Sequence, residues 1–322
     1  MPPQTDKAEV NIAVSTSAIL DMSAADAIWR AEQTGQQKSG AYFKYMKNKM
    51  DKPFEPGPLF ETIKALAEKP NHKIILVSRN SLMTGIRAMR TLLDAQIVPD
   101  KFSFTNGRPA APYLAYYKPN KFLTLSEEDA KQAHDLGIAT VVYDHLRSAT
   151  VSHTAPQVRT KPNFSTDADL RRDFLARSGG RKLSAIYDFD GVLADTSSDK
   201  IFEQHGLEAF RNHEANNVRH PMESGPHWKE FVRETGDTEE YITHIVSSRG
   251  TVPFMRIAET LLSHGIEPTG ESHGTNGKDK GPLLKIMCER YGPETMFADD
   301  SASKVENAQK HGIKTAGRAV TN

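Results

Sequence analysis

Short apolar runs typical of buried strands alternate with helical segments through most of the 322-residue chain. The clearest runs cover residues 10–20, 73–78, 138–144, 242–248 and 294–300. Amphipathic segments typical of helices occupy residues 84–96, 253–265 and 281–292. Strands that alternate with helices form parallel sheets, and such sheets bind their ligands at the carboxyl ends of the strands. The pattern therefore predicts an α/β fold with its functional groups at strand ends.

The length suits about two domains rather than one. A stretch mixing Ser, Thr, Pro and charged residues separates two α/β halves, which predicts a first half over 1–145, a linker over 146–182 and a second half over 183–322. Within the second half, a polar helical stretch at about 196–243 interrupts the strand–helix alternation. We expect this stretch to be an insertion.

The chain carries 41 basic and 41 acidic side chains, so its charge gives no reason to expect nucleic acid or a membrane as a partner. No stretch approaches the roughly 20 apolar residues that a membrane span requires. Cys288 is the only cysteine, which excludes an intramolecular disulfide and agrees with a reducing compartment. These features predict a cytoplasmic protein, and they leave its oligomeric state open, a homo-oligomer included.

Acidic residues cluster at two predicted strand ends in the second half. Asp188 and Asp190 follow one strand, two residues apart, and Asp299 and Asp300 end another. A carboxylate is ionised at neutral pH and can attack phosphorus, while a second one nearby can transfer a proton. Mg²⁺ prefers oxygen ligands and would offset the repulsion between a carboxylate and a phosphate, so Asp300 could complete a magnesium site.

Two further polar residues suit the same chemistry. Ser247 ends a strand and could bind a phosphoryl oxygen, and Lys280 precedes a helix and would supply a positive charge. Each element alone has a plain structural explanation, since Asp-x-Asp-Gly occurs in turns and Ser often caps a helix. Their order within one domain-sized segment makes the functional interpretation the better one.

This ordered set resembles the haloacid dehalogenase superfamily of phosphatases, and the resemblance covers the second half. It implies that Asp188 is the nucleophile and Asp190 the general acid/base, whose backbone carbonyl also binds Mg²⁺. It implies that Ser247 binds phosphate, that Lys280 is the conserved cation, and that Asp300 is a metal ligand with Asp299 behind it. The segment at about 196–243 corresponds to a small helical cap that closes over substrate.

A closer resemblance covers the full length. The runs AVSTSAIL, LVSRNSLMTGIRAMR, FTNGR, DFDGVLADTSSD, GPLL and FADD resemble the cytosolic 5′-nucleotidase type I family, which implies hydrolysis of nucleoside 5′-monophosphates. The chain has Ser247-Ser248 where that family's pattern leads us to expect Thr and a small residue, and Ser retains the hydroxyl. Lys280 is preferred over the nearby Lys278 because it directly precedes GPLL. Ser248, Arg249, Phe210, His213 and Asn217 are candidates for binding substrate.

The two halves also align with each other. LVSRNSLMTGIRAMRTLLDAQIVP matches IVSSRGTVPFMRIAETLLSHGIEP without a gap, which predicts an internal duplication into two Rossmann-like units. Ser15 and Ser17 then stand where Asp188 and Asp190 stand. Ala110 stands at Lys280, and Thr124-Leu125 at Asp299-Asp300. The first half therefore lacks the carboxylates that hold Mg²⁺.

Polar groups nevertheless remain in the first half at the corresponding strand ends: Ser15, Ser17, Ser78, Arg79, Asn80 and Arg108. They could bind a nucleotide, as part of the substrate or as an effector, since arginine suits phosphate. The competing interpretation is that Arg79 and Arg108 pair with surface acids. For the whole chain, two alternatives to a 5′-nucleotidase stay open: a sugar-phosphate phosphatase or phosphomutase of the same superfamily, and a nucleotide sensor without turnover.

Overall fold

The computed structural model describes residues 8–34, 36, 40–142 and 182–318, and it divides the chain into two compact units. One unit comprises Met1–Asp100 and Gly107–Thr160, and the other comprises Lys101–Asn106 and Lys161–Asn322. A short segment from the first half of the sequence thus belongs to the second unit. The predicted linker at 146–182 lies outside the described residues except for its last position.

The second unit is built on a sheet with the strand order β12-β11-β8-β9-β10-β5. Neighbouring strands run parallel except for β5, which pairs antiparallel with β10. The central strands are mostly apolar and are buried apart from their first residues, as expected for parallel strands covered on both faces. The strands are β5 (Lys101–Phe104), β8 (Leu183–Tyr187), β9 (Tyr241–Ser247), β10 (Ser272–Gly274), β11 (Met296–Asp299) and β12 (Thr315–Arg318).

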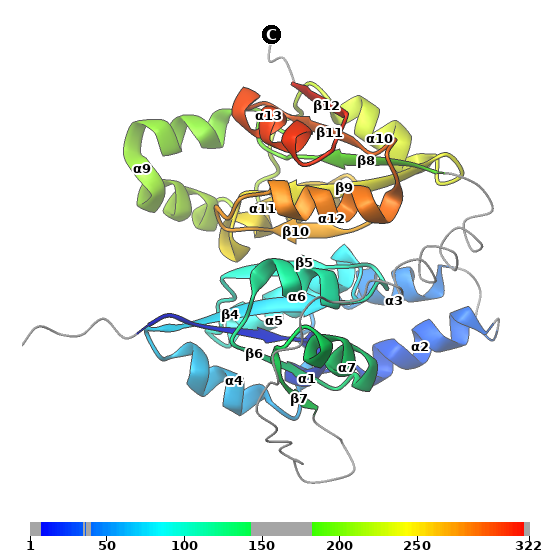
Figure 1. The fold of residues 1–322 in the computed structure, drawn as a ribbon, viewed down its shortest axis with the longest axis vertical. Helices are drawn as coiled ribbons and strands as arrows, with labels where there is room; N and C mark the ends of the chain where they lie inside the picture. Colours follow the sequence, from blue (N-terminus) through cyan, green and yellow to red (C-terminus); the bar gives the residue numbers. More distant parts are fainter. Residues whose placement is uncertain (1–7, 35, 37–39, 143–181, 319–322) are drawn as a thin grey trace, which may run out of the picture. The chain divides into compact units, whose positions relative to one another are not determined.

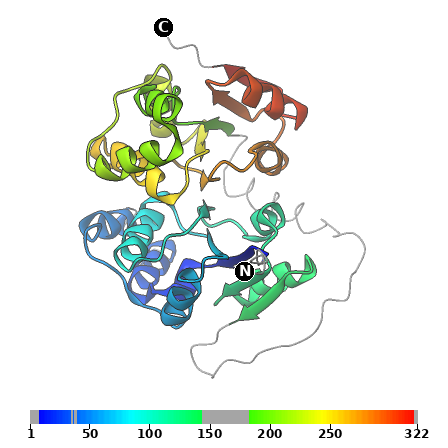
Figure 2. The same cartoon turned by 90° about the vertical axis from the view of Figure 1, so that its left-hand side faces the viewer.

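Helices cover both faces of this sheet. Figure 2 shows the yellow-green helices α9 to α11 on one side of the strands and the orange-red helices α12 and α13 on the other. The connection from each parallel strand to the next requires such crossover helices. Their bounds are α9 (Ser197–Asn216), α10 (Trp228–Gly236), α11 (Thr251–Ser263), α12 (Gly281–Tyr291) and α13 (Ala302–Lys310).

Two helices, α9 and α10, occupy the stretch that interrupts the sequence pattern. Helix α9 consists of two helical segments joined at a bend (Figure 1), where Gly206 adopts φ 80° and ψ −177°. Helix α10 packs against the sheet, since the fully buried ring of Phe231 meets the ring of Tyr187 on β8 edge-on. Helix α9 instead packs on α11.

The first unit has four parallel strands in the order β4-β1-β6-β7 and a small antiparallel pair, β2 with β3. Its strands are β1 (Val10–Val14), β2 (Leu20–Asp21), β3 (Glu55–Pro56), β4 (His72–Ser78), β6 (Lys121–Thr124) and β7 (Ala139–Val142). Its helices are α1 (Thr16–Ile19), α2 (Ser23–Gln33), α3 (Ala41–Asn48), α4 (Phe60–Ala67), α5 (Leu82–Asp94), α6 (Ala111–Tyr117) and α7 (Glu127–Asp135). The mixed α/β architecture predicted from the sequence is confirmed.

One predicted strand is too long. The run 10–20 was expected to be a single strand, but β1 ends at Val14 and α1 follows. The strand ends there because the chain leaves the sheet after Ser15, whose N–H still donates to the Leu123 carbonyl on β6. Apolar residues continue past this point because α1 is itself buried, so hydrophobicity alone did not reveal the change.

The internal sequence alignment also pairs Asn106 with Asn276, and the backbone takes similar conformations at these two residues and at Ala110 and Lys280. Asn106 and Asn276 have positive φ angles of 48° and 46°. Ala110 and Lys280, which precede α6 and α12, have φ and ψ angles of −76°, −26° and −75°, −25°. Positive φ is uncommon for residues other than glycine, so its recurrence at paired positions reflects the same local fold in both halves.

Candidate active site

Asp188 lies at the carboxyl end of β8 and is buried, with 2% of its surface exposed. Its N–H donates to the Ala298 carbonyl on β11 over 2.9 Å, which continues the pairing of the two strands. Its Oδ1 accepts a hydrogen bond from the N–H of Phe189 at 2.8 Å. Because β8 and β11 are parallel neighbours, the carboxylate of Asp188 lies beside those of Asp299 and Asp300, far away in sequence.

The turn after β8 brings Asp300 close. Gly191 has a φ of +65°, and a Cβ atom built on it would lie 2.6 Å from Oδ2 of Asp300. Glycine is therefore required both for the backbone conformation and for the approach of this carboxylate. One oxygen from each of Asp188, Asp299 and Asp300 lies within 4.8 Å of the others.

These three carboxylates fit a hard divalent cation. Carboxylate oxygens are the ligands that Mg²⁺ prefers. Burial, together with the negative charge of Asp188, raises the pKa of Asp300 above its ordinary value. Such a pKa shift means that ionised carboxylates are crowded in a region of low dielectric, and a bound cation would relieve that crowding.

Two lysines already neutralise part of this charge. Nζ of Lys280, at the start of α12, lies 2.7 Å from Oδ2 of Asp188 and 3.1 Å from Oδ2 of Asp299. Nζ of Lys304, on α13, lies 3.3 Å from Oδ2 of Asp188. Burial alone would raise the pKa of Asp188, but the two lysines outweigh it and hold that pKa below its ordinary value. Burial and the charge of Asp188 raise the pKa of Asp299 to about 7.

The two lysines therefore keep Asp188 ionised at neutral pH. Lys280 is identified from the sequence, whereas the role of Lys304 emerges only from the structure. The available signal was its position in the first helical turn after the Asp299-Asp300 pair, which places its side chain at the same strand ends. Lysines are common on helix surfaces, so this signal was weak without the tertiary structure.

Ser247 ends β9, the neighbour of β8 on its other side, and is fully buried. Its Oγ accepts a hydrogen bond from the N–H of Arg249 at 3.1 Å, which begins the turn into α11. The carbonyl of Ser248, the next residue, accepts from the N–H of Gly277 at 2.9 Å. These bonds hold the turn after β9 against the loop that leads to Lys280.

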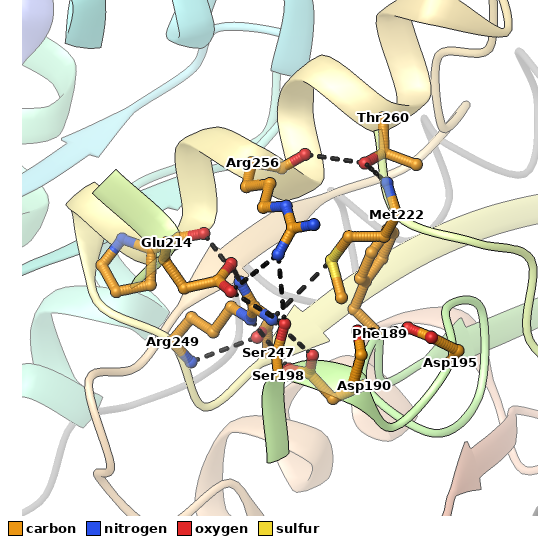
Figure 3. Close-up of polar contacts among 12 residues, drawn as sticks. Phe189, Asp190, Asp195, Ser198, Glu214, Met222, Ser247, Arg249, Arg256 and Thr260 are labelled. Atoms are coloured by element: carbon orange, nitrogen blue, oxygen red, sulfur yellow. Dashed lines mark hydrogen bonds and ion pairs between the residues drawn. The ribbon is translucent and has the colours of Figure 1, made fainter. Parts of the chain in front are cut away.

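Arg249 makes a two-pronged contact with Asp190. Its Nε and Nη2 donate to the two carboxylate oxygens of Asp190 over 2.8 and 2.5 Å. Its Nη1 pairs with Oε2 of Glu214, a residue of α9, as Figure 3 shows. The Arg249 side chain is only 2% exposed. Both carboxylates raise the pKa of its guanidinium against the lowering effect of burial.

The other substrate-binding candidates come from α9. The ring of Phe210 faces the guanidinium of Arg249, with 5.1 Å between the guanidinium carbon and the ring centroid. Nε2 of His213 lies 3.2 Å from Nη1 of Arg256. Asn217 donates to the carbonyl of His213 over 2.8 Å. Phe210 and His213 therefore lie on the side of α9 that faces Arg249 and α11, and Asn217 directly follows the last residue of α9.

In the first unit, hydroxyl groups occupy the corresponding strand ends. Oγ of Ser15 lies 3.4 Å from Oγ of Ser17, and the Thr16 hydroxyl lies 2.7 Å from that of Ser78. Nδ2 of Asn80 donates to the Thr16 hydroxyl, also over 2.7 Å. The cluster is held together by hydroxyl and amide groups and contains no carboxylate among its members.

Arg79 is engaged with acids of its own unit. Its Nη2 donates to Oδ1 of Asp129 over 2.6 Å and pairs with Glu128 over 3.0 Å. These contacts agree with the competing interpretation of the sequence, in which Arg79 pairs with acidic side chains. Arg108, the other arginine of that prediction, is half-buried in the loop before α6.

The turns after β6 in the first unit and after β11 in the second make the same contact with different groups. The Ser126 N–H donates to the Thr124 hydroxyl over 3.1 Å, as the Ser301 N–H donates to Oδ1 of Asp299 over 3.0 Å. A hydroxyl thus makes the turn contact that a carboxylate makes in the second unit. The local turn is retained although the group that could hold a cation is not.

By fold and site, the second unit is a doubly wound α/β domain with an ionised aspartate, two lysines and further carboxylates at the carboxyl edge of its parallel sheet. The whole chain belongs to the 5′-nucleotidase family, since a sequence model of that family matches residues 1–174 and 170–320. It is 25% identical over 335 aligned positions to human cytosolic 5′-nucleotidase 1B. The alignment covers 96% of this chain and 49% of the human protein, so the chain spans about half the length of that relative.

Among solved structures, a dehalogenase crystal structure matches with a TM-score of 0.32 and 14% identity. The match covers 42% of this chain and 84% of the dehalogenase. A similarity at this level carries no argument about function. In the described part of the chain, every helix is too short or too polar to cross a membrane.

Proposed function

We propose that this chain is a 5′-nucleotidase that hydrolyses nucleoside 5′-monophosphates to a nucleoside and phosphate. The observation that carries the proposal is Asp188, a buried carboxylate that two lysines keep ionised beside two further carboxylates. The family to which the chain belongs supports the reaction type. The residue roles that we propose are those implied by the resemblance of the second half to the haloacid dehalogenase superfamily, and the contacts of Asp188 support them.

In the first step, a carboxylate oxygen of Asp188 attacks phosphorus and the bond between phosphorus and the nucleoside O5′ breaks. Asp190 donates a proton to that O5′, which leaves as a hydroxyl. In the second step, Asp190 takes a proton from a water molecule that attacks the aspartyl phosphate, which releases phosphate and restores Asp188. A nucleophilic carboxylate thus divides the hydrolysis into two easier displacements.

Lys280 stabilises the negative charge around the transferred phosphoryl group, and the Ser247 hydroxyl donates to one of its oxygens. Mg²⁺, held by Asp188, Asp300 and the Asp190 carbonyl with Asp299 behind them, would neutralise the repulsion between nucleophile and substrate. Of these residues, Lys280 has the most direct structural support, because it lies 2.7 Å from Asp188.

Helix α9 is proposed as the cap that covers the nucleoside, with Phe210, His213, Asn217 and Ser248 as candidate contacts. A cap of this kind excludes water from the reaction. A sugar-phosphate phosphatase or phosphomutase would use the same strand-end groups and a different cap. The base and sugar preference therefore depends on α9, and we expect a cytoplasmic protein, as the name of the human relative states for that protein.

For the first unit, we propose that it arose with the second by duplication and lost its carboxylates. The positive φ angles shared by Asn106 and Asn276 support this origin. Binding of a nucleotide effector by the first unit stays a prediction. Titrating an Arg108→Ala variant with ADP and with substrate tests it, because unchanged affinity and unchanged kinetics for both would remove the idea.

The decisive experiment measures phosphate release from a panel of nucleoside monophosphates and sugar phosphates, with Mg²⁺ and with EDTA. Asp188→Asn should abolish release while the protein stays folded, as judged by circular dichroism. Asp135→Asn, on the exposed end of α7, is the control and should retain full activity. Release from sugar phosphates alone, or retained activity in Asp188→Asn, would refute the proposal.

A further inference from the structure

Arg249 has its donors committed inside the second unit. Nε and Nη2 hold both oxygens of Asp190, and Nη1 pairs with Glu214 and donates to the Pro253 carbonyl over 3.0 Å. The planar guanidinium makes the contact with Asp190 a fork, which fixes the plane of the carboxylate as well as its position. A side chain that is 2% exposed and held in this way is poorly placed to bind a substrate directly.

Glu214 lies at the centre of a second set of contacts. It is fully buried, and its Oε1 accepts hydrogen bonds from Ser198 at 2.8 Å and from Nη1 of Arg256 at 3.0 Å. Ser198 belongs to the first helical segment of α9 and Glu214 to the second, on either side of the bend at Gly206. Glu214 therefore connects both segments of α9 to Arg249, as the contacts drawn in Figure 3 show.

We infer that Arg249 is a positioning residue, which holds the Asp190 carboxylate in the orientation for proton transfer and links that orientation to α9 through Glu214. The inference rests on the proposed function, in which Asp190 protonates the leaving O5′. The Asp190 side chain is 15% exposed, so it can reach a substrate while Arg249 grips it from the buried side. This role replaces the substrate-binding role predicted for Arg249 from the sequence.

The chemistry of the leaving group separates this role from a merely structural one. A nucleoside O5′ is a poor leaving group and depends on the proton from Asp190. A p-nitrophenolate is a good leaving group and departs without a proton. Loss of a general acid typically lowers the rate by about 10²–10⁴-fold. A misplaced acid should therefore slow nucleotide turnover far more than turnover of p-nitrophenyl phosphate.

The test compares Arg249→Lys with Arg256→Lys on both substrates. Arg249→Lys keeps a cation opposite Glu214 and removes the fork on Asp190. Arg256→Lys is the matched control, because Arg256 shares Glu214 with Arg249 while its other contacts run to Ser198, His213 and the His220 carbonyl.

We expect Arg249→Lys to lower kcat for a nucleoside monophosphate by about 10²-fold, the typical cost of misplacing a reacting group by about 1 Å. Its kcat for p-nitrophenyl phosphate should fall by less than about 5-fold, given that this leaving group needs no acid. Arg256→Lys should change both values by the same small factor. In an Asp190→Asn background, Arg249→Lys should add little further loss, because the two residues act as one unit.

An equal loss on both substrates in Arg249→Lys, or full additivity with Asp190→Asn, would overturn the inference. Folding of each variant is checked by its thermal melting curve. If Arg249→Lys does not fold, Glu214→Gln releases the guanidinium from its other side and should produce the same difference between substrates. A wild-type chain that hydrolyses neither substrate would instead refute the proposed function, so the two failures are distinguishable.

Discussion

Replacing Gly191 by alanine tests whether the approach of Asp300 to Asp188 matters for a bound cation. The added Cβ would lie 2.6, 2.8 and 2.9 Å from Oδ2, Cγ and Cβ of Asp300. The shortest of these distances is about 0.8 Å below the 3.4 Å at which ordinary contact begins. Since the clash involves the whole Asp300 side chain, rotation of its carboxylate alone does not relieve it.

The substitution has a second cost, which a control isolates. Gly191 has φ +65°, a conformation that costs an alanine about 1–2 kcal/mol. Gly265, after α11, has φ +67° with nothing within 4 Å of an added Cβ. At about 2–4 °C per kcal/mol, each alanine variant should lower Tm by about 2–8 °C. Only Gly191→Ala also displaces a proposed metal ligand.

The assay is phosphate release from a nucleoside monophosphate over a range of Mg²⁺ concentrations. We expect Gly191→Ala to need at least about 10-fold more Mg²⁺ for half-maximal activity, since displacing a reacting or ligating group by about 1 Å costs up to about 10²-fold. Gly265→Ala should follow the wild-type curve. Identical Mg²⁺ dependence in the two variants would refute the assignment of Asp300 to the cation.

Three further predictions concern residues and the proposed cation site of the second unit. EDTA should abolish phosphate release and Mg²⁺ restore it, and activity that resists EDTA would contradict the cation site. Glu271→Gln should cost about 3 kcal/mol in urea unfolding because buried Glu271 pairs with Arg290 at 2.9 Å, whereas Glu289→Gln on the surface should cost less than about 0.5 kcal/mol. Glu234 accepts a hydrogen bond from the Tyr187 hydroxyl, and burial raises the pKa of Glu234 above 4.5. The contribution of Glu234 to the free energy of unfolding is therefore complete below pH 4.5 and is lost as the pH rises. The stability cost of Glu234→Gln should accordingly shrink between about pH 4.5 and 7.

The local pattern of the chain was enough to predict most of its elements. Strands such as 73–78 and 242–248, and helices such as 253–265, agree with the structure to within two residues. Parallel strands that are buried on both faces have nearly continuous apolar sequences, so they can be recognised from the sequence alone. The exception at 10–20 shows the limit, because a buried short helix after β1 is as apolar as a strand.

The contacts of the site could not be predicted in the same way. Lys304 comes within reach of Asp188 only because α13 follows β11, the sheet neighbour of β8. The partners of Arg249 are 59 and 35 residues away in sequence, and no local pattern identifies them. The β5 strand, similarly, joins the second unit through its pairing with β10.

By itself, the sequence determined the α/β class, the strand ends that carry Asp188, Ser247 and Asp300, the helix start that carries Lys280, and the resemblance to a nucleotidase family. It could do so because strand-end chemistry depends on residue type and local spacing. Only the tertiary structure decided which charged groups pair. Two lysines contact Asp188, and Arg249 pairs with Asp190 instead of being exposed to solvent. Electrostatic partners depend on distances across the sheet, and the order of the strands, not the order of the residues, sets those distances.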